Sequence, residues 1–300
     1  MSLVEGKNCL ITGATSGIGR STALALSKMG ANIFFIARNA DKAEELREEI
    51  KEISGKSPHV IIGDLSSLNQ IKKVAEEYKY LNEPIDILLN NAGIMNTERR
   101  VTEDGLEEVF AVNHLAYFLL TNLLIDEVLR SSVKRVVNVS SDAHRFLKSI
   151  NFDDLQSEKE FKMFTVYGQS KLANILFTKK LSTLYQDRGL TTNCLHPGFV
   201  STSIGTQNQN RPFLARLIKW VSPLIGKTSD KGAETSIYLC SSEEVSSTSG
   251  EYFIDCKKAP IIKASQFQTD LPKLFCILFI FSRLSYWSFF TVYKILPRDT

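Results

Sequence analysis

The sequence predicts an α/β fold, a doubly wound parallel sheet of seven strands with helices on both faces. Apolar runs of strand length alternate along the chain with longer segments of helical period. Runs such as "IDILL" and "KRVVNVS" are apolar at nearly every residue, which indicates strands buried on both faces. A cluster of glycines stands where the first strand gives way to the first helix.

The expected elements alternate through most of the chain. Strands are expected at residues 8–11, 32–37, 59–63, 85–89, 134–140, 192–196 and 251–254. Helices are expected at residues 18–29, 41–53, 68–80, 103–131, 166–187 and 229–240. We therefore expect one main domain at residues 1–258, followed by a C-terminal tail at residues 259–300.

Composition excludes several classes of protein. The 300 residues are 43% hydrophobic, and their 36 basic and 33 acidic residues are interspersed. The sequence has no block of Lys and Arg residues that could bind along a phosphate backbone, so nucleic acid is not an expected partner. The five cysteines are odd in number and form no Cys-x-x-Cys pair, which disfavours a disulfide framework or a zinc site. The opening "MSLVEGKN" lacks the pattern of a signal peptide, so we expect a cytoplasmic protein.

The glycines predict a phosphate-binding turn. In "CLITGATSGIGRSTALAL", Gly13, Gly17 and Gly19 lie between a strand and a helix. The N-terminus of a helix carries unpaired N–H groups and a partial positive charge, and glycines let a pyrophosphate approach them. This context is that of a Rossmann-type dinucleotide site, although the spacing is Gly-x-x-x-Gly-x-Gly rather than Gly-x-Gly-x-x-Gly. An ordinary glycine-rich turn is the alternative.

The end of the second strand indicates which dinucleotide binds. In "FFIARNADK", Arg38 stands where sites that prefer NAD carry a carboxylate. A guanidinium can hold the 2′-phosphate of NADP(H) through two N–H bonds. We therefore favour NADP(H). NAD(H) is the alternative if Asp41 reaches the ribose instead.

A tyrosine and a lysine on one helix face predict acid–base chemistry. In "VYGQSKLANILF", Tyr167 and Lys171 lie four residues apart, one helical turn from each other. An ammonium about 4 Å from a phenol, at an effective dielectric of about 20, is worth roughly 4 kcal/mol, or about three pKa units. The pair could therefore bring the phenol toward neutrality. An exposed Tyr/Lys pair is the alternative for this motif alone.

Other polar residues fall where a site of this fold is expected. "NNAG" with Asn90 and "NVSS" with Ser140 and Ser141 end the fourth and fifth strands, and Asn113 lies inside a long helix. Either Ser140 or Ser141 could supply a hydroxyl at this place. The histidines His114 and His144 have no partners at ligand spacing, so we interpret both as structural and expect no metal.

The motifs "TGATSGIG", "GDLSS", "NNAG", "VNH", "NVSS", "YGQSK" and "HPGFVST" occur in this order. With them the sequence resembles the short-chain dehydrogenase/reductase superfamily over residues 7–256. It is most similar to the retinol dehydrogenase group, through "TEDGLEEVFAVNHLAYFLLTNLL", "DDLQSEK", "SKLANILFTKKL" and the long interval between Ser141 and Tyr167. The resemblance implies an oxidoreductase that acts on CH–OH donors and reduces carbonyls where NADPH predominates.

The resemblance also implies roles for individual residues. Tyr167 would be the general acid in carbonyl reduction, with Ser141 hydrogen-bonded to the substrate oxygen. Ser140 competes with Ser141 for this role, and the alignment with the family's motif favours Ser141. Lys171 would bind the nicotinamide ribose and lower the pKa of the tyrosine, and Asn113 would hold a water that continues the proton path. The implied cofactor contacts are Gly13, Thr15, Ser16, Gly17, Ile18, Gly19, Arg38, Asp64, Leu65, Asn90, Ala92, Gly93, Tyr167, Lys171, Pro197, Gly198, Val200 and Thr202.

Two segments bear on substrate and location. Residues 199–228 would form a lid, whose residues 213–221 offer either an apolar face for a hydrophobic aldehyde, ketone or alcohol, or a helix that completes the core. Residues 274–296 carry only two charges, Arg283 and Lys294. For this tail we favour contact with a membrane surface, and leave open a spanning anchor, packing against a second subunit and a weakly ordered terminus.

The expected function is thus an NADP(H)-dependent oxidoreductase that interconverts an apolar carbonyl and its alcohol, such as retinal and retinol, a lipid aldehyde or a steroid. The alternative is a dinucleotide-binding regulator or scaffold without turnover. Relatives pair through their two long helices, here residues 103–131 and 166–187, so a homodimer is an additional expectation.

Overall fold

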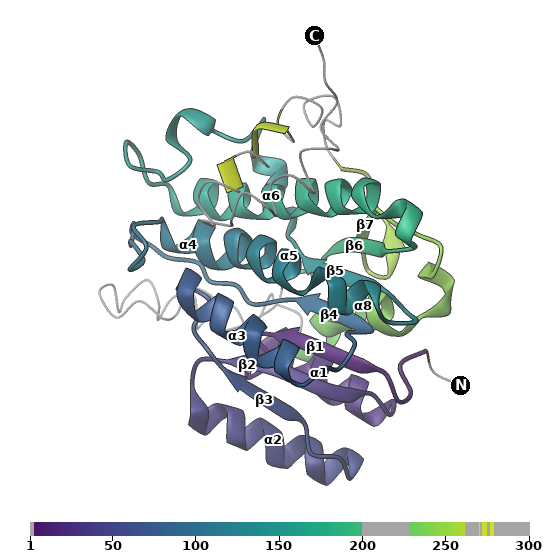
Figure 1. Ribbon diagram of the computed structural model, residues 1–300. Helices are drawn as coiled ribbons and strands as arrows, with labels where there is room; N and C mark the ends of the chain where they lie inside the picture. Colours follow the sequence, from purple (N-terminus) through teal and green to yellow (C-terminus); the bar gives the residue numbers. More distant parts are fainter. Residues whose placement is uncertain (1–2, 200–227, 262–269, 271, 275–276, 279–300) are drawn as a thin grey trace.

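The computed structural model describes residues 3–199, 228–261, 270, 272–274 and 277–278, and Figure 1 shows their arrangement. All of the lid expected at residues 199–228 except its two end residues, and most of the apolar part of the tail at residues 274–296, therefore lie outside the described residues. The division between a domain and a tail stays a prediction.

The doubly wound sheet is confirmed. Seven strands run parallel, in the spatial order β3-β2-β1-β4-β5-β6-β7, and an eighth pairs antiparallel at the β7 edge. The strands are β1 (Asn8–Thr12), β2 (Asn32–Ala37), β3 (His59–Ile62), β4 (Ile87–Asn90), β5 (Arg135–Val139), β6 (Thr191–His196), β7 (Tyr252–Ile254) and β8 (Lys257–Lys258). The order reverses between β1 and β4, where open sheets of this kind bind ligands.

Helices cover both faces of the sheet (Figure 1). One face carries α1 (Gly17–Lys28), α2 (Ala40–Ser54) and α8 (Ser229–Ser241), and the other carries α3 (Leu68–Tyr80), α4 (Glu108–Phe110), α5 (Ala116–Leu129) and α6 (Met163–Leu184). Short 3-10 helices are η2 (Asp142–Phe146), η3 (Phe152–Asp154), η4 (Gln186–Arg188) and η5 (Glu243–Val245). Successive residues of β1 point to opposite layers, Leu10 toward α3 and α5, and Cys9 and Ile11 toward α1 and α2. Both sets are buried, which explains the continuous apolar runs.

The predicted number of seven strands is wrong by one. Asp255 and Cys256 both have positive φ, 48° and 61°, so the chain turns back after Ile254 and pairs with Lys257. A tight hairpin turn of two residues that matches the twist of its strands requires a positive φ at both residues. Asp-Cys is not one of the usual sequences for such a turn, and the two lysines that follow are exposed, so nothing in their pattern indicated a strand.

The helix predicted at residues 103–131 starts later and is irregular. It begins at Glu108, because the Glu107 carboxylate accepts hydrogen bonds from the backbone N–H groups of Val109 and Phe110 and so caps the helix. Its second element, η1 (Ala111–Leu115), is a π-helical turn, and α5 follows it. Such turns are rare and occur frequently at functional sites.

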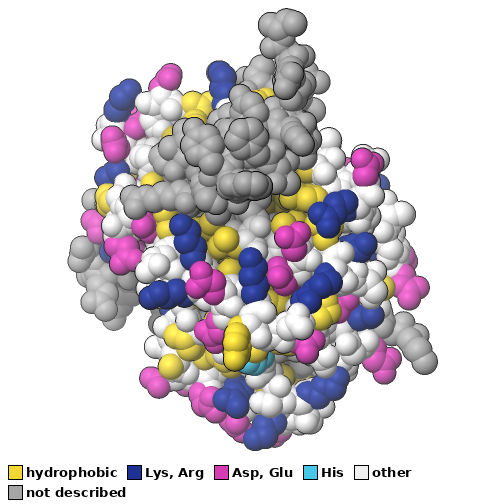
Figure 2. All heavy atoms as spheres, in the orientation of Figure 1, with side chains coloured by type: hydrophobic (Ala, Val, Ile, Leu, Met, Phe, Trp, Pro, Cys, Tyr) yellow, Lys and Arg dark blue, Asp and Glu magenta, His cyan; other side chains and the backbone are white. Residues whose placement is uncertain are grey.

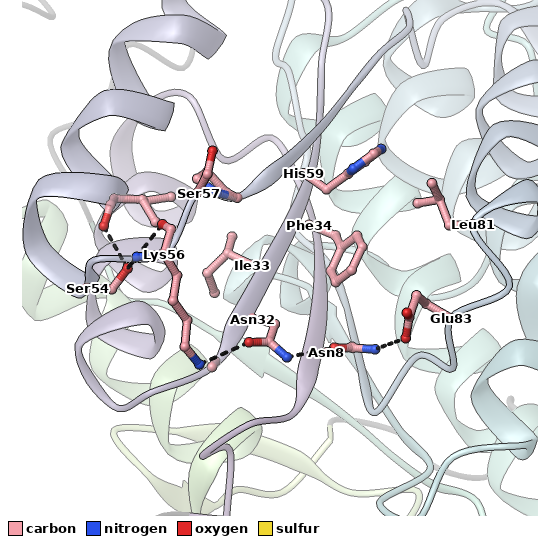
Figure 3. A pocket seen from close by; sticks show the side chains of 13 residues that line it. Asn8, Asn32, Ile33, Phe34, Ser54, Lys56, Ser57, His59, Leu81 and Glu83 are labelled. Atoms are coloured by element: carbon pink, nitrogen blue, oxygen red, sulfur yellow. Dashed lines mark hydrogen bonds between the residues drawn. The ribbon is translucent and has the colours of Figure 1, made fainter.

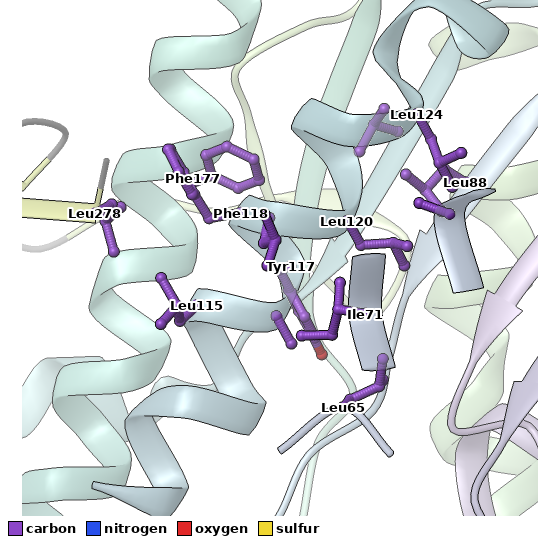
Figure 4. Close-up of a cluster of buried hydrophobic side chains, with 14 of the residues drawn as sticks. Leu65, Ile71, Leu88, Leu115, Tyr117, Phe118, Leu120, Leu124, Phe177 and Leu278 are labelled. Atoms are coloured by element: carbon purple, nitrogen blue, oxygen red, sulfur yellow. The ribbon is translucent and has the colours of Figure 1, made fainter. Parts of the chain in front are cut away.

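One helical stretch of the described chain, Glu108–Leu129, is long and apolar enough to cross a membrane, but 83% of its most apolar window is buried inside the fold. Figure 4 shows why: Leu115, Phe118 and Leu120 of this stretch pack among side chains of α3, α6 and β4. The stretch is therefore a core helix. Leu274 and Leu278 are fully buried in the same cluster, so these two residues of the tail pack on the protein.

The surface agrees with the charge pattern of the sequence. On the face shown in Figure 2, basic and acidic side chains are intermingled without a block of one sign.

Arg135, at the start of β5, is a buried cation that closes the end of a helix. It is 2% exposed, and its Nη1 donates to the carbonyl oxygens of Leu239, Cys240 and Ser242 at 3.0–3.1 Å. The last carbonyls of a helix have no partner within the helix. Arg135 therefore satisfies the C-terminus of α8 and ties it to the centre of the sheet.

Replacing this cation tests its structural role. We expect Arg135→Met to lower the free energy of unfolding by about 3 kcal/mol, because buried carbonyl oxygens lose charged donors. The measurement is urea denaturation followed by circular dichroism. The matched control is Arg130→Met, which removes an exposed guanidinium bonded to Asn82 and should change stability by less than about 0.5 kcal/mol. Equal losses in the two variants would contradict the assignment.

Candidate active site

A cavity of about 350 Å³ lies at the carboxyl ends of the central strands. It extends from the end of β2, at Arg38, to Tyr167 and Lys171 on α6. The structure brings most of the expected site residues together around it, namely Gly13, Thr15, Ser16, Gly17, Ile18, Gly19, Arg38, Asp64, Leu65, Ala92, Gly93, Tyr167, Lys171 and Pro197. The carboxyl ends of β1 and β4 meet here, at the reversal of strand order.

Several expected residues lie elsewhere. Asn90 does not line the cavity: it is fully buried below it and donates to the side-chain oxygens of Thr121 and Asn138 at 3.0 and 2.9 Å. Gly198 follows Pro197 but does not line the cavity either. Val200 and Thr202 lie outside the described residues.

The cavity also has lining residues that the sequence analysis missed. They include Asn39, Lys42, Asn91, Ile94, Val112 and Val139. Lys42 lies in the first turn of α2 and adds a second basic residue to the end of the cavity at Arg38; the spacing Arg-x-x-x-Lys after a strand was its signal. Asn91 donates from Nδ2 to the carbonyl oxygens of Thr12 and Gly13, so it fastens β4 to the glycine turn.

The start of α1 can receive an anion. Its N-cap residue Ser16 makes no capping hydrogen bond through its side chain, and no acidic residue lies in the first turn. Gly13 has a φ of +67°, and a Cβ there would lie 2.8 Å from Cα of Ala92. A Cβ on Gly19 would overlap the carbonyl oxygen of Gly13. These glycines therefore allow close contact between the first residues of α1, the turn and the end of β4. The N–H groups at the start of α1 have no side-chain cap and lie at the cavity.

Tyr167 and Lys171 meet the end of β5. The hydroxyl of Ser141 is hydrogen-bonded to the Tyr167 hydroxyl. Ser140 is occupied differently, because its hydroxyl donates to the carbonyl oxygen of Lys171 at 2.8 Å. The preference for Ser141 over Ser140 stays a prediction: Ser141 is the serine bonded to Tyr167, whereas Ser140 is the one that lines the cavity.

The ammonium of Lys171 is almost enclosed. Lys171 is 2% exposed, and its Nζ donates to the carbonyl oxygen of Val139 at 3.1 Å. It lies 5.6 and 5.7 Å from the ring centroids of Tyr167 and Tyr117, within the range of cation–π attraction. Burial lowers the pKa of Lys171 to about 7.

The tyrosine does not show the expected acidity. Burial raises the pKa of Tyr167 to about 12, and the hydrogen bond from Ser141 opposes that shift only in part. The net shift is upward and so opposite to the one expected, and Lys171 is not among its causes. Tyr167 is consequently protonated at neutral pH.

Asn113 lies in the π-helical turn, and its side chain is bonded to protein. Its Oδ1 accepts from the backbone N–H of Ile94 at 2.7 Å, and its Nδ2 donates to the Ile94 carbonyl and to the Ser170 hydroxyl. Its backbone carbonyl accepts from Nδ2 of Asn174 at 2.9 Å. Asn113 therefore holds the segment after β4 against α6.

The two histidines are buried and make side-chain hydrogen bonds. Nδ1 of His114 lies 2.8 Å from Oδ1 of Asn174, and burial lowers the pKa of His114 to about 4. Nδ1 of His144 lies 2.7 Å from the carbonyl oxygen of Ser141. Among the described residues there is no group of three histidine, cysteine, aspartate or glutamate side chains that could hold a metal.

A second cavity, of about 490 Å³, lies at the opposite ends of the strands. Figure 3 shows a chain of hydrogen bonds across it, from Lys56 to Asn32, to Asn8 and to Glu83. Asn8 and Asn32 begin β1 and β2, so this cavity is remote from Tyr167 and Lys171. None of the residues expected in the active site lines it.

Comparison with known proteins identifies the relatives of this chain. A family model described as short chain dehydrogenase matches residues 7–212. Retinol dehydrogenase 14 of Homo sapiens is 41% identical over 290 residues, which cover 92% of this chain and 86% of that protein. Retinol dehydrogenase 12 of Homo sapiens is 41% identical over 257 residues, covering 85% of this chain and 79% of the relative.

Solved structures share the fold. A protein from Mycobacterium paratuberculosis has a TM-score of 0.70 at 26% identity, with coverage of 94% of this chain and 95% of that chain. A short chain dehydrogenase from Escherichia coli CFT073 complexed with NADPH has a TM-score of 0.66 at 24% identity, with coverage of 84% and 97%. With the family match and the relatives at about 40% identity, these findings establish that the chain belongs to the short chain dehydrogenase family of oxidoreductases and is similar to the retinol dehydrogenases.

Proposed function

We propose that this protein reduces an apolar aldehyde or ketone to its alcohol with NADPH, and catalyses the reverse oxidation with NADP⁺. The observation that carries the proposal is the arrangement of a protonated Tyr167, bonded to Ser141, and the buried Lys171 at one end of a glycine-lined cavity. A regulator that only senses a dinucleotide has no need for this proton donor.

The dinucleotide would lie along the cavity with its pyrophosphate at the N-terminus of α1. The uncapped N–H groups there suit an anion. Arg38 and Lys42 at the end of β2 would hold the 2′-phosphate, a charge that a carboxylate at this place would repel. The relative from Escherichia coli binds NADPH, which agrees with this choice over NADH.

The residues at the other end have complementary tasks. Tyr167 donates the proton to the carbonyl oxygen, because its raised pKa keeps the hydroxyl protonated. Ser141 binds the same oxygen and holds it beside Tyr167. Lys171 binds the ribose next to the nicotinamide through its ammonium, and Asn113 acts by holding the segment after β4 in place. The bound cofactor supplies the hydride.

Exposed aromatic side chains favour an apolar substrate. Among the large hydrophobic side chains that the described residues expose, Phe146, Phe164 and Phe199 are 77%, 59% and 81% exposed. In sequence, Phe146 follows Ser141, Phe164 precedes Tyr167 by one helical turn, and Phe199 follows Pro197. All three are thus close in sequence to residues of the site, and exposed apolar groups that gather on a surface often mark a binding site. The name retinol dehydrogenase also belongs to relatives that act on an apolar alcohol.

Removing the proton donor tests the chemistry. We expect Tyr167→Phe to lower kcat for NADPH oxidation by about 100-fold or more, since general acid catalysis contributes roughly that factor. The assay follows NADPH absorbance with retinal, decanal and a steroid ketone. Tyr80→Phe, on the exposed surface of α3, is the control and should keep wild-type turnover. Equal turnover in Tyr167→Phe and wild type, or turnover of none of the three carbonyls by the wild type, would refute the proposal.

Cofactor choice is tested at the other end of the cavity. We expect Arg38→Asp to weaken NADPH binding by about 10-fold to 100-fold, because a charge-assisted contact is lost and repulsion is added. NADH binding should change by less than about threefold, since NADH carries no 2′-phosphate. Titration calorimetry measures both. The control Arg47→Asp, on the exposed face of α2, should leave the ratio of the NADPH and NADH affinities unchanged. An unchanged ratio in Arg38→Asp would contradict the role of Arg38 at the 2′-phosphate.

The buried lysine makes stability depend on pH. The pKa of Lys171 falls from 10.5 to about 7, so between these values the unfolded chain binds more protons than the folded one, and stability rises with pH. We expect Lys171→Met to stabilise the cofactor-free protein at pH 6 by at most about 5 kcal/mol, and by less than about 1 kcal/mol at pH 10. Urea denaturation at pH 6, 8 and 10 measures this. Exposed Lys73→Met is the control, and a pH-independent effect of Lys171→Met would be the contrary result.

A further inference from the structure

We propose that His144 is a positioning residue, whose imidazole fixes the backbone of Ser141 so that the serine hydroxyl meets Tyr167. This inference rests on the proposed function, in which Ser141 and Tyr167 bind the reacting oxygen.

His144 contacts Ser141 directly. Nδ1 of His144 lies 2.7 Å from the carbonyl oxygen of Ser141. A carbonyl oxygen can only accept, so the ring nitrogen carries the hydrogen and donates. The backbone N–H of His144 points to the same oxygen at 3.3 Å, and the backbone N–H of Ala143 donates to Oγ of Ser141 at 3.2 Å. Ser141 is thus held at its carbonyl by His144 and at its hydroxyl by Ala143.

The ring of His144 makes no competing polar contact within the part of the chain that the structure describes. His144 is 2% exposed, and its Nε2 has no hydrogen-bond partner among the described residues. Burial lowers the pKa of His144, so the ring is neutral and carries one N–H. A buried polar ring costs free energy unless it is bonded. The bond to Ser141 is therefore the polar contact that accounts for a histidine at this position.

The ring of His144 is itself fixed by a distant part of the chain. It stacks edge-on against Tyr252 of β7, with ring centroids 5.1 Å apart. The Tyr252 hydroxyl donates to Oδ1 of Asp142 at 2.9 Å, and Nε of Arg145 donates to the same oxygen at 2.7 Å. The segment Asp142–Phe146 is therefore anchored to the sheet on one side.

On its other side this segment touches the helix that carries the tyrosine. A Cβ on Gly168 would lie 2.6 Å from the carbonyl oxygen of Ala143, so backbone meets backbone next to Tyr167. Because both partners are in van der Waals contact, a shift of the segment changes the position of Ser141 relative to Tyr167. A displacement of about 1 Å in a catalytic group can cost up to about 100-fold in rate.

Four variants test the inference with the NADPH assay and the carbonyls named above. Asn places an amide N–H at the position of Nδ1, whereas Gln places it at the position of Nε2. We expect His144→Gln and His144→Leu to lower kcat by about 10-fold, with the KM for NADPH changed by less than about twofold. His144→Asn should retain kcat within about threefold of the wild type. Equal losses in His144→Asn and His144→Gln would overturn the inference, even if His144→Leu fails to fold.

A double-mutant cycle separates positioning from a general structural effect. In the background of Ser141→Ala, His144→Gln should cause no further loss of kcat beyond about twofold, because the residue that it positions has lost its hydroxyl. The same 10-fold loss in both backgrounds would overturn the inference and leave the proposed function standing. If Ser141→Ala itself does not lower turnover, the proposed role of Ser141 fails instead. Thermal unfolding of every variant checks that each protein is folded, so that the values of kcat can be compared.

Discussion

The structure depends on a stripe of polar side chains buried along one face of α6. Ser170, Lys171, Asn174 and Thr178 are each no more than 2% exposed, and all four contact the end of β5, the π-helical turn or α6 itself through hydrogen bonds. A buried polar group without a partner costs free energy, so each bond restricts the rotation and the axial position of the helix. Because these bonds fix α6, they also fix the position of Tyr167, which lies one turn before the stripe and lines the cavity.

The same stripe connects the two halves of the site. The Val139 carbonyl accepts from both Lys171 and Asn174, and Asn174 also reaches the backbone of Asn113 in the π-helical turn. Strand β5, helix α6 and the segment after β4 therefore share one set of hydrogen bonds. The arrangement has a cost, since Lys171 is desolvated and its pKa is lowered to about 7. A site that holds a charge ready for a cofactor gives up stability without that cofactor.

The sequence predicted the fold and the residues around the cavity because both follow from local patterns. Apolar runs identify strands buried on both faces, and glycines identify the turn before α1. The remainder depends on contacts between distant segments. The hairpin at Asp255 uses an unusual pair of residues, and the π-helical turn at Asn113 is maintained by a bond from Asn174 on another helix. Asn90 was placed in the site because it ends a strand, but its side chain points into the interior, toward Asn138. The direction of the pKa shift of Tyr167 was missed, because burial cannot be read from a spacing of four residues.

The most direct test of this account is a crystal structure of the complex with NADP⁺. The account predicts the pyrophosphate at the first N–H groups of α1 and the 2′-phosphate beside Arg38. It also predicts the ammonium of Lys171 on the nicotinamide ribose, with the Tyr167 hydroxyl facing the reactive carbon of the ring. A dinucleotide bound outside the glycine-lined cavity, or a nicotinamide ring turned away from Tyr167, would contradict it.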